Sequence, residues 1–291
     1  MIGKRIPSEE LAFALNELHM NVHLREFLGK WLESGFSNHV LGQSILLDNL
    51  SALPQEEDLT GRRITELEQT LKDGVDHCQD FAGIFRDNPS FDRDIDNNRL
   101  LDVLVEVETY RWLRKSGFGN IRKLRETRRR TVDFTAEKTG QFMAIEATRF
   151  RNPVSAEKVV PTTFEREVFL GDANEPIHME GYHEKTASPK IQQSIRDAVN
   201  SKLPQLRAFH KDHPEFGLIL VVSTGNGFIY SRKYLHHVAG MLPQTPRRAA
   251  EVVWEGLGDG VRALVEGFVL LRGQRESVHP DSLASFIGTN E

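Results

Sequence analysis

The sequence predicts an α/β protein, in which a mixed sheet is flanked by helices and preceded by an all-helical N-terminal region. Two observations predict this fold class. After about residue 99, short apolar runs alternate with helical patterns, which is typical of a sheet covered on its faces. Residues 8 to about 86 show helical spacing throughout. Because the segment DNPSFDRDIDNN (87–98) is dense in turn formers and acids, we place a boundary there and expect two domains, 1–88 and 95–291.

The N-terminal region is predicted to contain several helices. Ser8, followed by two glutamates, is typical of a helix start, and apolar residues follow at helical spacing up to Val22. Further helices are expected over 25–34 and 38–50. A long helical segment is expected over about 62–85, where apolar residues recur at Ile64, Leu67, Leu71, Val75 and Phe81.

The C-terminal part is predicted to alternate between helices and strands. Helix 99–116 ends at Gly117, and the run GLILVVS (217–223) is apolar enough for a central strand. The other expected elements, in chain order, are strands 131–136 and 141–148, an irregular stretch 151–188, helix 189–210, helix 246–257 and an apolar run 263–271.

The composition is that of an ordinary folded protein, with 39% hydrophobic and 27% charged residues among 291. The formal net charge of −5 does not indicate a nucleic-acid binder, so any such surface must be a local patch. Cys78 is the single cysteine, and no long apolar segment occurs. We therefore expect a cytoplasmic protein with no disulfide framework and no membrane span.

Helix 99–116 carries two candidate functional acids, Glu106 and Glu108, on a surface that is apolar nearly all round. Either could be an inward-facing carboxylate. The alternative is that both are helix-edge acids that pair with Arg111, Arg114 or Lys115.

Asp133 and Glu146 lie on the two expected strands 131–136 and 141–148. Strand alternation predicts that Val132 and Phe134 point to the face opposite Asp133. Two carboxylates on adjacent strands can approach closely enough to bridge one hard cation such as Mg²⁺. The alternative places Asp133 at a strand end and Glu146 on an exposed edge.

Lys202 lies in the middle of the apolar stripe of helix 189–210, and Gln205 lines the same side. Because an unpaired buried charge is costly, this placement predicts that Lys202 meets the acids. Two alternatives stay open: the side chain can extend its ammonium group to water along an aliphatic stem, or Pro204 can restart the helix and turn Lys202 outward.

The segment RKLRETRRRT (122–131) is the most concentrated basic region of the chain. It directly precedes Asp133, so Arg125, Arg128, Arg129 and Arg130 are predicted to contact nucleic-acid phosphates. The alternative is a solvated basic hairpin. Other chemistries are poorly supported, since the sequence lacks zinc-ligand spacing, a P-loop and a serine nucleophile elbow.

With these residues assembled, the region 100–222 resembles the restriction-endonuclease-like PD-(D/E)XK phosphodiesterase superfamily. In several branches the first helix carries Glu, then Leu seven and Gly eleven residues later, which here match Glu106, Leu113 and Gly117. This match favours Glu106 over Glu108. VDF supplies Asp133, and EKTGQFMAIEAT supplies Glu146.

The chain departs from the family pattern at Thr148, which stands where the family has its lysine. Some branches carry the lysine on the following helix in contexts resembling K-x-x-Q-L, and KLPQL (202–206) matches that context. The resemblance therefore implies that Lys202 is the relocated lysine and that Gln205 is an auxiliary polar residue.

The resemblance implies a Mg²⁺- or Mn²⁺-dependent nuclease, with DNA as the expected substrate and defence against foreign DNA as a role known in the superfamily. Asp133, Glu146 and the Ala147 carbonyl would bind the metal, Glu106 would bind it directly or through water, and Lys202 would orient the attacking water. One alternative is an inactive nucleic-acid-binding or assembly subunit of the same fold. Another is that the helical N-terminal region recruits a protein partner, for instance a helicase or ATPase. Oligomeric state is left open.

Overall fold

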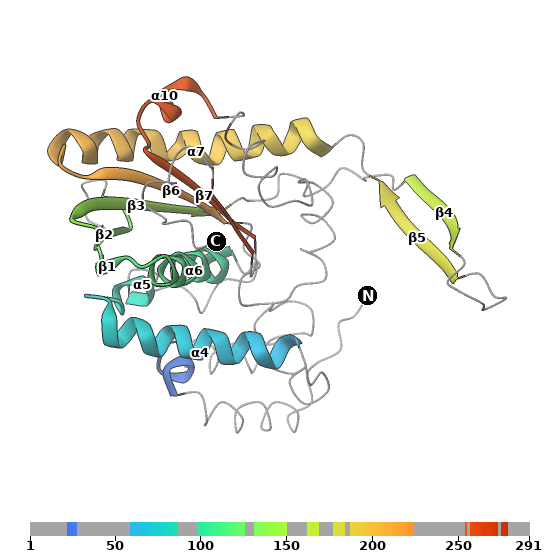
Figure 1. The fold of residues 1–291 in the computed structure, drawn as a ribbon, viewed down its shortest axis with the longest axis horizontal. Coiled ribbons are helices and arrows are strands. Elements are labelled where there is room, and N and C mark those ends of the chain that lie inside the picture. Colours follow the sequence, from blue (N-terminus) through green and yellow to red (C-terminus); the bar gives the residue numbers. More distant parts are fainter. Residues whose placement is uncertain are drawn as a thin grey trace.

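The computed structural model describes residues 22–27, 59–86, 98–125, 131–149, 162–168, 177–183, 187–223, 254, 257–272 and 275–278. These residues form a mixed sheet with helices on both of its faces (Figure 1), which confirms the predicted α/β class. Among the helices in these ranges, none is long and apolar enough to cross a bilayer.

The main sheet has six strands in the order β1-β2-β3-β6-β7-β8. The bounds are β1 Gly119–Lys123, β2 Phe134–Lys138, β3 Gln141–Arg149, β6 Gly217–Ser223, β7 Gly267–Arg272 and β8 Arg275–Val278. The three central strands β3, β6 and β7 run parallel, whereas β1, β2 and β8 pair antiparallel to their neighbours. β6 is buried on both faces, which is why it reads as the continuous apolar run GLILVVS.

Two hydrophobic cores lie on opposite faces of this sheet. On one face, α6 (Asn98–Lys115) packs on the strands, with α4 (Leu59–His77) and α5 (Gly83–Arg86) outside it. On the other face lie α7 (Ala187–Asp212) and α10 (Asp259–Arg262). Figure 1 shows the sheet between α7 and α6. Alternate residues of β6 enter the two cores, with Ile219 and Val221 facing α6 and Leu220 facing α7.

Residues on both sides of the predicted boundary at 88–95 share the α6-side core. Leu67 and Leu71 of α4 are fully buried against it, and Asp73 of α4 accepts hydrogen bonds from Tyr110 and Arg114 of α6. The predicted helices 8–22, 25–34 and 38–50 lie outside the described residues except at 22–27, which is helical. Leu24 in this short segment is fully buried in the same core.

Several element bounds differ from the prediction. The helix expected over 62–85 ends at His77, and α5 follows after an irregular stretch. β1 was not predicted, and the stretch 151–188, expected to be irregular, contains a separate two-stranded sheet of β4 (Thr162–Val168) and β5 (Ile177–His183). The apolar run 263–271 contains most of β7, which begins at Gly267. The expected helix 246–257 lies mostly outside the described residues.

Candidate functional site

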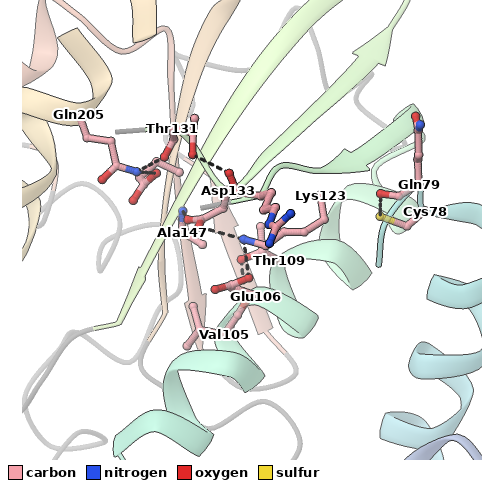
Figure 2. Close-up of polar contacts among 12 residues, drawn as sticks. Cys78, Gln79, Val105, Glu106, Thr109, Lys123, Thr131, Asp133, Ala147 and Gln205 are labelled. Carbon is pink, nitrogen blue, oxygen red and sulfur yellow. Dashed lines mark hydrogen bonds and ion pairs between the residues drawn. The ribbon is translucent and has the colours of Figure 1, made fainter. Parts of the chain in front are cut away.

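The two predicted strand carboxylates, Asp133 and Glu146, lie close together beside the start of β2. Glu146 lies within β3, whereas Asp133 stands just before β2, at a bend in the chain. The Asp133 N–H still donates to the Ile145 carbonyl at 3.0 Å, and the Asp133 carboxylate accepts the Ala147 N–H at 2.8 Å. The Ala147 N–H of β3 is thus bound by the Asp133 side chain and not by a backbone carbonyl of β2, which begins only at Phe134 (Figure 2).

The bend also corrects the predicted alternation around Asp133. Val132 packs in the α7-side core, and Phe134 packs in the α6-side core, so these two neighbours do not share a face. The reason is that regular strand geometry starts only at Phe134. Asp133 therefore occupies the edge between the two cores, within reach of groups from both.

Lys202 and Gln205 both reach Glu146 from α7. The Lys202 ammonium lies 2.6 Å from one carboxylate oxygen of Glu146, and the Gln205 amide donates to the other at 2.8 Å. The same amide donates to the Thr131 carbonyl. α7 continues through Pro204, so the proline does not turn Lys202 outward. Since 31% of the Lys202 side chain and none of Glu146 is exposed, the lysine lies between the buried acid and solvent.

Burial and neighbouring charge set the ionisation of this pair. Burial, with the nearby charge of Asp133 as a second cause, raises the pKa of Glu146 well above its usual range, although Lys202 opposes the shift. Burial alone would lower the pKa of Lys202, but the charges of Glu146 and Asp133 outweigh it and raise that pKa. The carboxylates and the amine are therefore close enough to control one another's charge.

Lys123, which belongs to the basic segment 122–131, is buried at the same site. Its ammonium lies 2.7 Å from Glu106 and 3.2 Å from Asp133, and only 2% of its side chain is exposed. Figure 2 shows it between these two acids. Burial would lower the pKa of Lys123, but Asp133 and Glu106 raise it above its usual value. In the sequence, the weak signal is that Lys123 and the apolar Ile121 are two residues apart, so that they share a strand face.

Both candidate acids of α6 point towards the sheet, but to different places. Glu106 meets Lys123 beside Asp133, while Glu108 accepts a hydrogen bond from Ser223 at the end of β6, at 2.5 Å. Two arginines that the sequence offered as partners of these acids contact α4, where Arg111 lies 2.9 Å from Glu66 and Arg114 lies 3.0 Å from Asp73. Of the two, only Glu106 is thus placed near Asp133.

The remaining predicted positions are less informative. Thr148, at the family's usual lysine position, is 9% exposed and follows Glu146 by two residues on β3. Its neighbour Arg149 is buried and lies 2.9 Å from Asp102 of α6. In the predicted phosphate-binding set, Arg125 is exposed, whereas Arg128, Arg129 and Arg130 lie outside the described residues.

The donor set at this place suits a hard divalent cation. Within the described ranges, no three His, Cys, Asp or Glu side chains are arranged to hold a metal ion. Each of the three acids is paired with a lysine, but Asp133 and Glu146 lie side by side next to Ala147, whereas Glu106 reaches this place from α6 through Lys123. The N–H of Ala147 points to Asp133, and the carbonyl of a strand residue points to the same edge as its N–H, so the Ala147 carbonyl faces this acid as well. Two carboxylates and a carbonyl, completed by water and phosphate, are ligands that Mg²⁺ accepts.

Comparisons with protein-family models, with curated proteins and with solved structures found no significant match to this chain.

Proposed function

We propose that this chain is a Mg²⁺- or Mn²⁺-dependent nuclease with a restriction-endonuclease-like fold. The observation that carries the proposal is the contact of Lys202, from α7, with Glu146, which lies on β3 beside Asp133. Asp133 and Glu146 are 13 positions apart in the chain, and Lys202 follows Glu146 by 56 positions. All three nevertheless lie together beside the start of β2. Such a gathering of buried charges is unfavourable for folding alone, which is why perturbed charges of this kind are associated with functional sites.

In the proposed mechanism, Asp133, Glu146 and the Ala147 carbonyl would hold the divalent cation. When bound, that cation would supply positive charge opposite the phosphate and lower the pKa of an attacking water. The Asp133 carboxylate is fixed in place by the Ala147 N–H, and that of Glu146 by the Gln205 amide. Fixed ligands require no reorganisation during the reaction, which is the main source of electrostatic catalysis.

The exposed fraction of Lys202 supports its role in the chemical step. Because 31% of its side chain is open to solvent, its ammonium can donate to water or to a phosphate oxygen while it stays beside Glu146. It would orient the attacking water and stabilise the negative charge that develops on the phosphoryl group. Gln205 would act through Glu146, since its amide also anchors α7 to the Thr131 carbonyl ahead of Asp133.

DNA is the proposed substrate, and defence against foreign DNA is the role that the resemblance favours. Arg125 is exposed and belongs to the basic segment 122–131. It would contact the phosphate backbone together with the basic residues that follow it. The helical N-terminal region is proposed to recruit a protein partner, through residues other than those of α4 that pack on α6.

A second candidate function is a nucleic-acid-binding or assembly subunit without cleavage activity. Two observations favour it. Thr148 replaces the strand lysine of the resembling family. In addition, Lys123 and Lys202 already neutralise much of the charge of the three acids with no metal ion.

The test is cleavage of plasmid DNA, single-stranded DNA and RNA by the purified chain, with Mg²⁺, with Mn²⁺ and with EDTA. Asp133→Ala, Glu146→Gln and Lys202→Met should each lower the cleavage rate by about 100-fold or more. Lys211→Met is the matched control, because Lys211 is exposed near the end of the same helix, and its loss should leave the rate unchanged.

Retention of full cleavage activity in all three variants would refute the assignment of the site. Salt-dependent DNA binding without metal-dependent cleavage, unchanged by Asp133→Ala, would instead support the second candidate. Circular dichroism of each variant separates loss of activity from loss of fold.

A further inference from the structure

The two lysines of the site differ in solvent exposure, so only one of them can contact a substrate. Lys202 is 31% exposed, whereas Lys123 is 2% exposed. The exposed part of the Lys202 side chain is open to water and to a phosphate group. The Lys123 ammonium is enclosed by Glu106, Asp133 and the ring of Phe134, whose centroid lies 5.3 Å away. Lys123 is therefore a positioning residue and not a group that touches the substrate.

The backbone on both sides of Lys123 is hydrogen-bonded, which fixes the point from which its side chain reaches Glu106 and Asp133. The Lys123 N–H donates to the Gln79 carbonyl at 2.9 Å, and the Gln79 N–H donates to the Ile121 carbonyl at 2.9 Å. On the other side, the Leu124 N–H donates to the Asp133 carbonyl at 2.9 Å. The lysine is thus bound between the loop after α4 and the residue it neutralises (Figure 2).

The charges of the site limit how many divalent ions it can accept. Three carboxylates, Glu106, Asp133 and Glu146, and two ammonium groups have a formal sum of −1 at neutral pH. One divalent ion changes this sum to +1, and a second would change it to +3 in a largely buried cluster. Because uncompensated buried charge is costly, a second ion is disfavoured. Without Lys123 the sum would be −2, and a second ion would have two acids to bind.

We propose that Lys123 is a built-in cation that takes the place of a second divalent ion, so that the site binds a single metal ion between Asp133 and Glu146. This inference rests on the proposed nuclease function and specifies its metal requirement. Glu106 then serves to hold Lys123 and does not bind the metal directly. In two-metal sites the two ions together stabilise the attacking and the leaving oxygens, so a single-ion site would rely more on Lys202.

The inference is tested by titrating Mn²⁺ alone, with no nucleic acid, into the full chain after removal of metal with EDTA. Isothermal titration calorimetry and the electron paramagnetic resonance signal of free Mn²⁺ give the number of ions bound. The wild-type chain should bind one ion and Lys123→Met should bind two. Because each occupied site adds its own binding free energy to stability, Mn²⁺ should raise the Tm of Lys123→Met about twice as much as that of the wild type.

Two variants serve as controls. Glu106→Gln with Lys123→Met restores the wild-type charge sum, and this double variant should again bind one ion. Lys123→Arg keeps the charge, and it should also bind one ion. If Lys123→Met does not fold without metal, it is refolded in Mn²⁺ and the ions it retains are counted after gel filtration. One retained ion would then overturn the role of Lys123.

The outcomes separate this inference from the function on which it rests. Two ions bound by the wild-type chain, or one ion bound by Lys123→Met with unchanged stability, would overturn the role of Lys123 and leave the nuclease proposal standing. The same holds if the double variant binds two ions. No Mn²⁺ binding by the wild-type chain would overturn the metal-dependent function itself.

Discussion

Replacement of Lys202 by Met tests whether the Lys202–Glu146 contact is a buried ion pair. The substitution keeps a side chain of similar length but removes the ammonium 2.6 Å from a carboxylate with no exposed surface. It also removes one of the two lysines that lower the pKa of Glu146, so that this pKa should rise further. The variant should be less stable than the wild type at neutral pH.

The magnitude of this loss has an upper bound, because a stranded carboxylate can escape by taking up a proton. The ordinary pKa of glutamate, 4.5, lies roughly 2.5 pH units below pH 7. Protonating such a carboxylate at pH 7 therefore costs about 3.4 kcal/mol. At pH 5.5 the same bound is about 1.4 kcal/mol. The loss in unfolding free energy should therefore lie between about 1 and 3.4 kcal/mol at pH 7 and should shrink as the pH falls.

The sign follows from proton linkage. Between pH 4.5 and the raised pKa, the folded variant binds a proton that the unfolded chain has released. Its unfolding free energy must then fall as the pH rises through that window. The wild type, whose Lys202 stabilises the ionised form, should show a smaller fall.

Urea unfolding at several pH values between 5 and 7.5 measures this difference. Lys211→Met is the control, with an expected change within about 0.5 kcal/mol. In a Glu146→Gln background, Lys202→Met should cost much less, since no carboxylate is left to strand. A loss that is independent of pH, or that persists in the Glu146→Gln background, would refute the ion-pair reasoning.

Two further predictions concern the packing of α4. Gly74→Ala should destabilise the chain by about 1–3 kcal/mol in urea unfolding, because a Cβ at Gly74 would overlap the buried ring of Phe81. Val75→Ala, at an exposed position, is the control, and a Gly74→Ala variant more stable than the wild type would contradict the packing. Burial raises the pKa of the Cys78 thiol from 9.0 to about 12, so iodoacetamide at pH 8 should label the folded chain at least ~1000-fold more slowly than the urea-unfolded chain. Labelling of the folded chain at the unfolded rate would show that Cys78 is accessible.

The parts of the fold that the sequence predicted well are those with a strong periodic signal. The strand expected at 217–223 is β6 to the residue, and the helices expected at 99–116 and 189–210 are α6 and α7 within one or two residues at each end. A strand buried on both faces is apolar throughout, and a long helix repeats its apolar stripe several times. β1 spans five residues and has only two buried positions, so its alternation is too short to recognise.

The site was predictable where an acid or a base interrupts such a periodic pattern. Lys202 interrupts the apolar stripe of α7 between Val199 and Leu206, both fully buried, and that anomaly predicted its inward position. The choice between Glu106 and Glu108 could not be made from helical spacing. Both face the sheet, and only the strand register decides that Glu106 is beside Lys123 while Glu108 reaches Ser223.

Lys123 illustrates a limit of sequence reasoning that has a physical cause. A burial cost of several kcal/mol applies to an unpaired ammonium, and a sequence shows such a cost only when the local pattern reveals burial. Here the pattern around Lys123 is IRKLR, in which three of five residues are cations and two of them are adjacent, so Lys123 resembles one more solvated residue of a basic segment. Its partners are Glu106 on α6, 17 positions earlier, and Asp133, ten positions later. Both lie beside it in the register that pairs Lys123 with Phe134. A buried charge on a short strand is therefore specified by tertiary register, whereas one on a long helix is specified by its own sequence, and site residues of the first kind have to be sought in the structure.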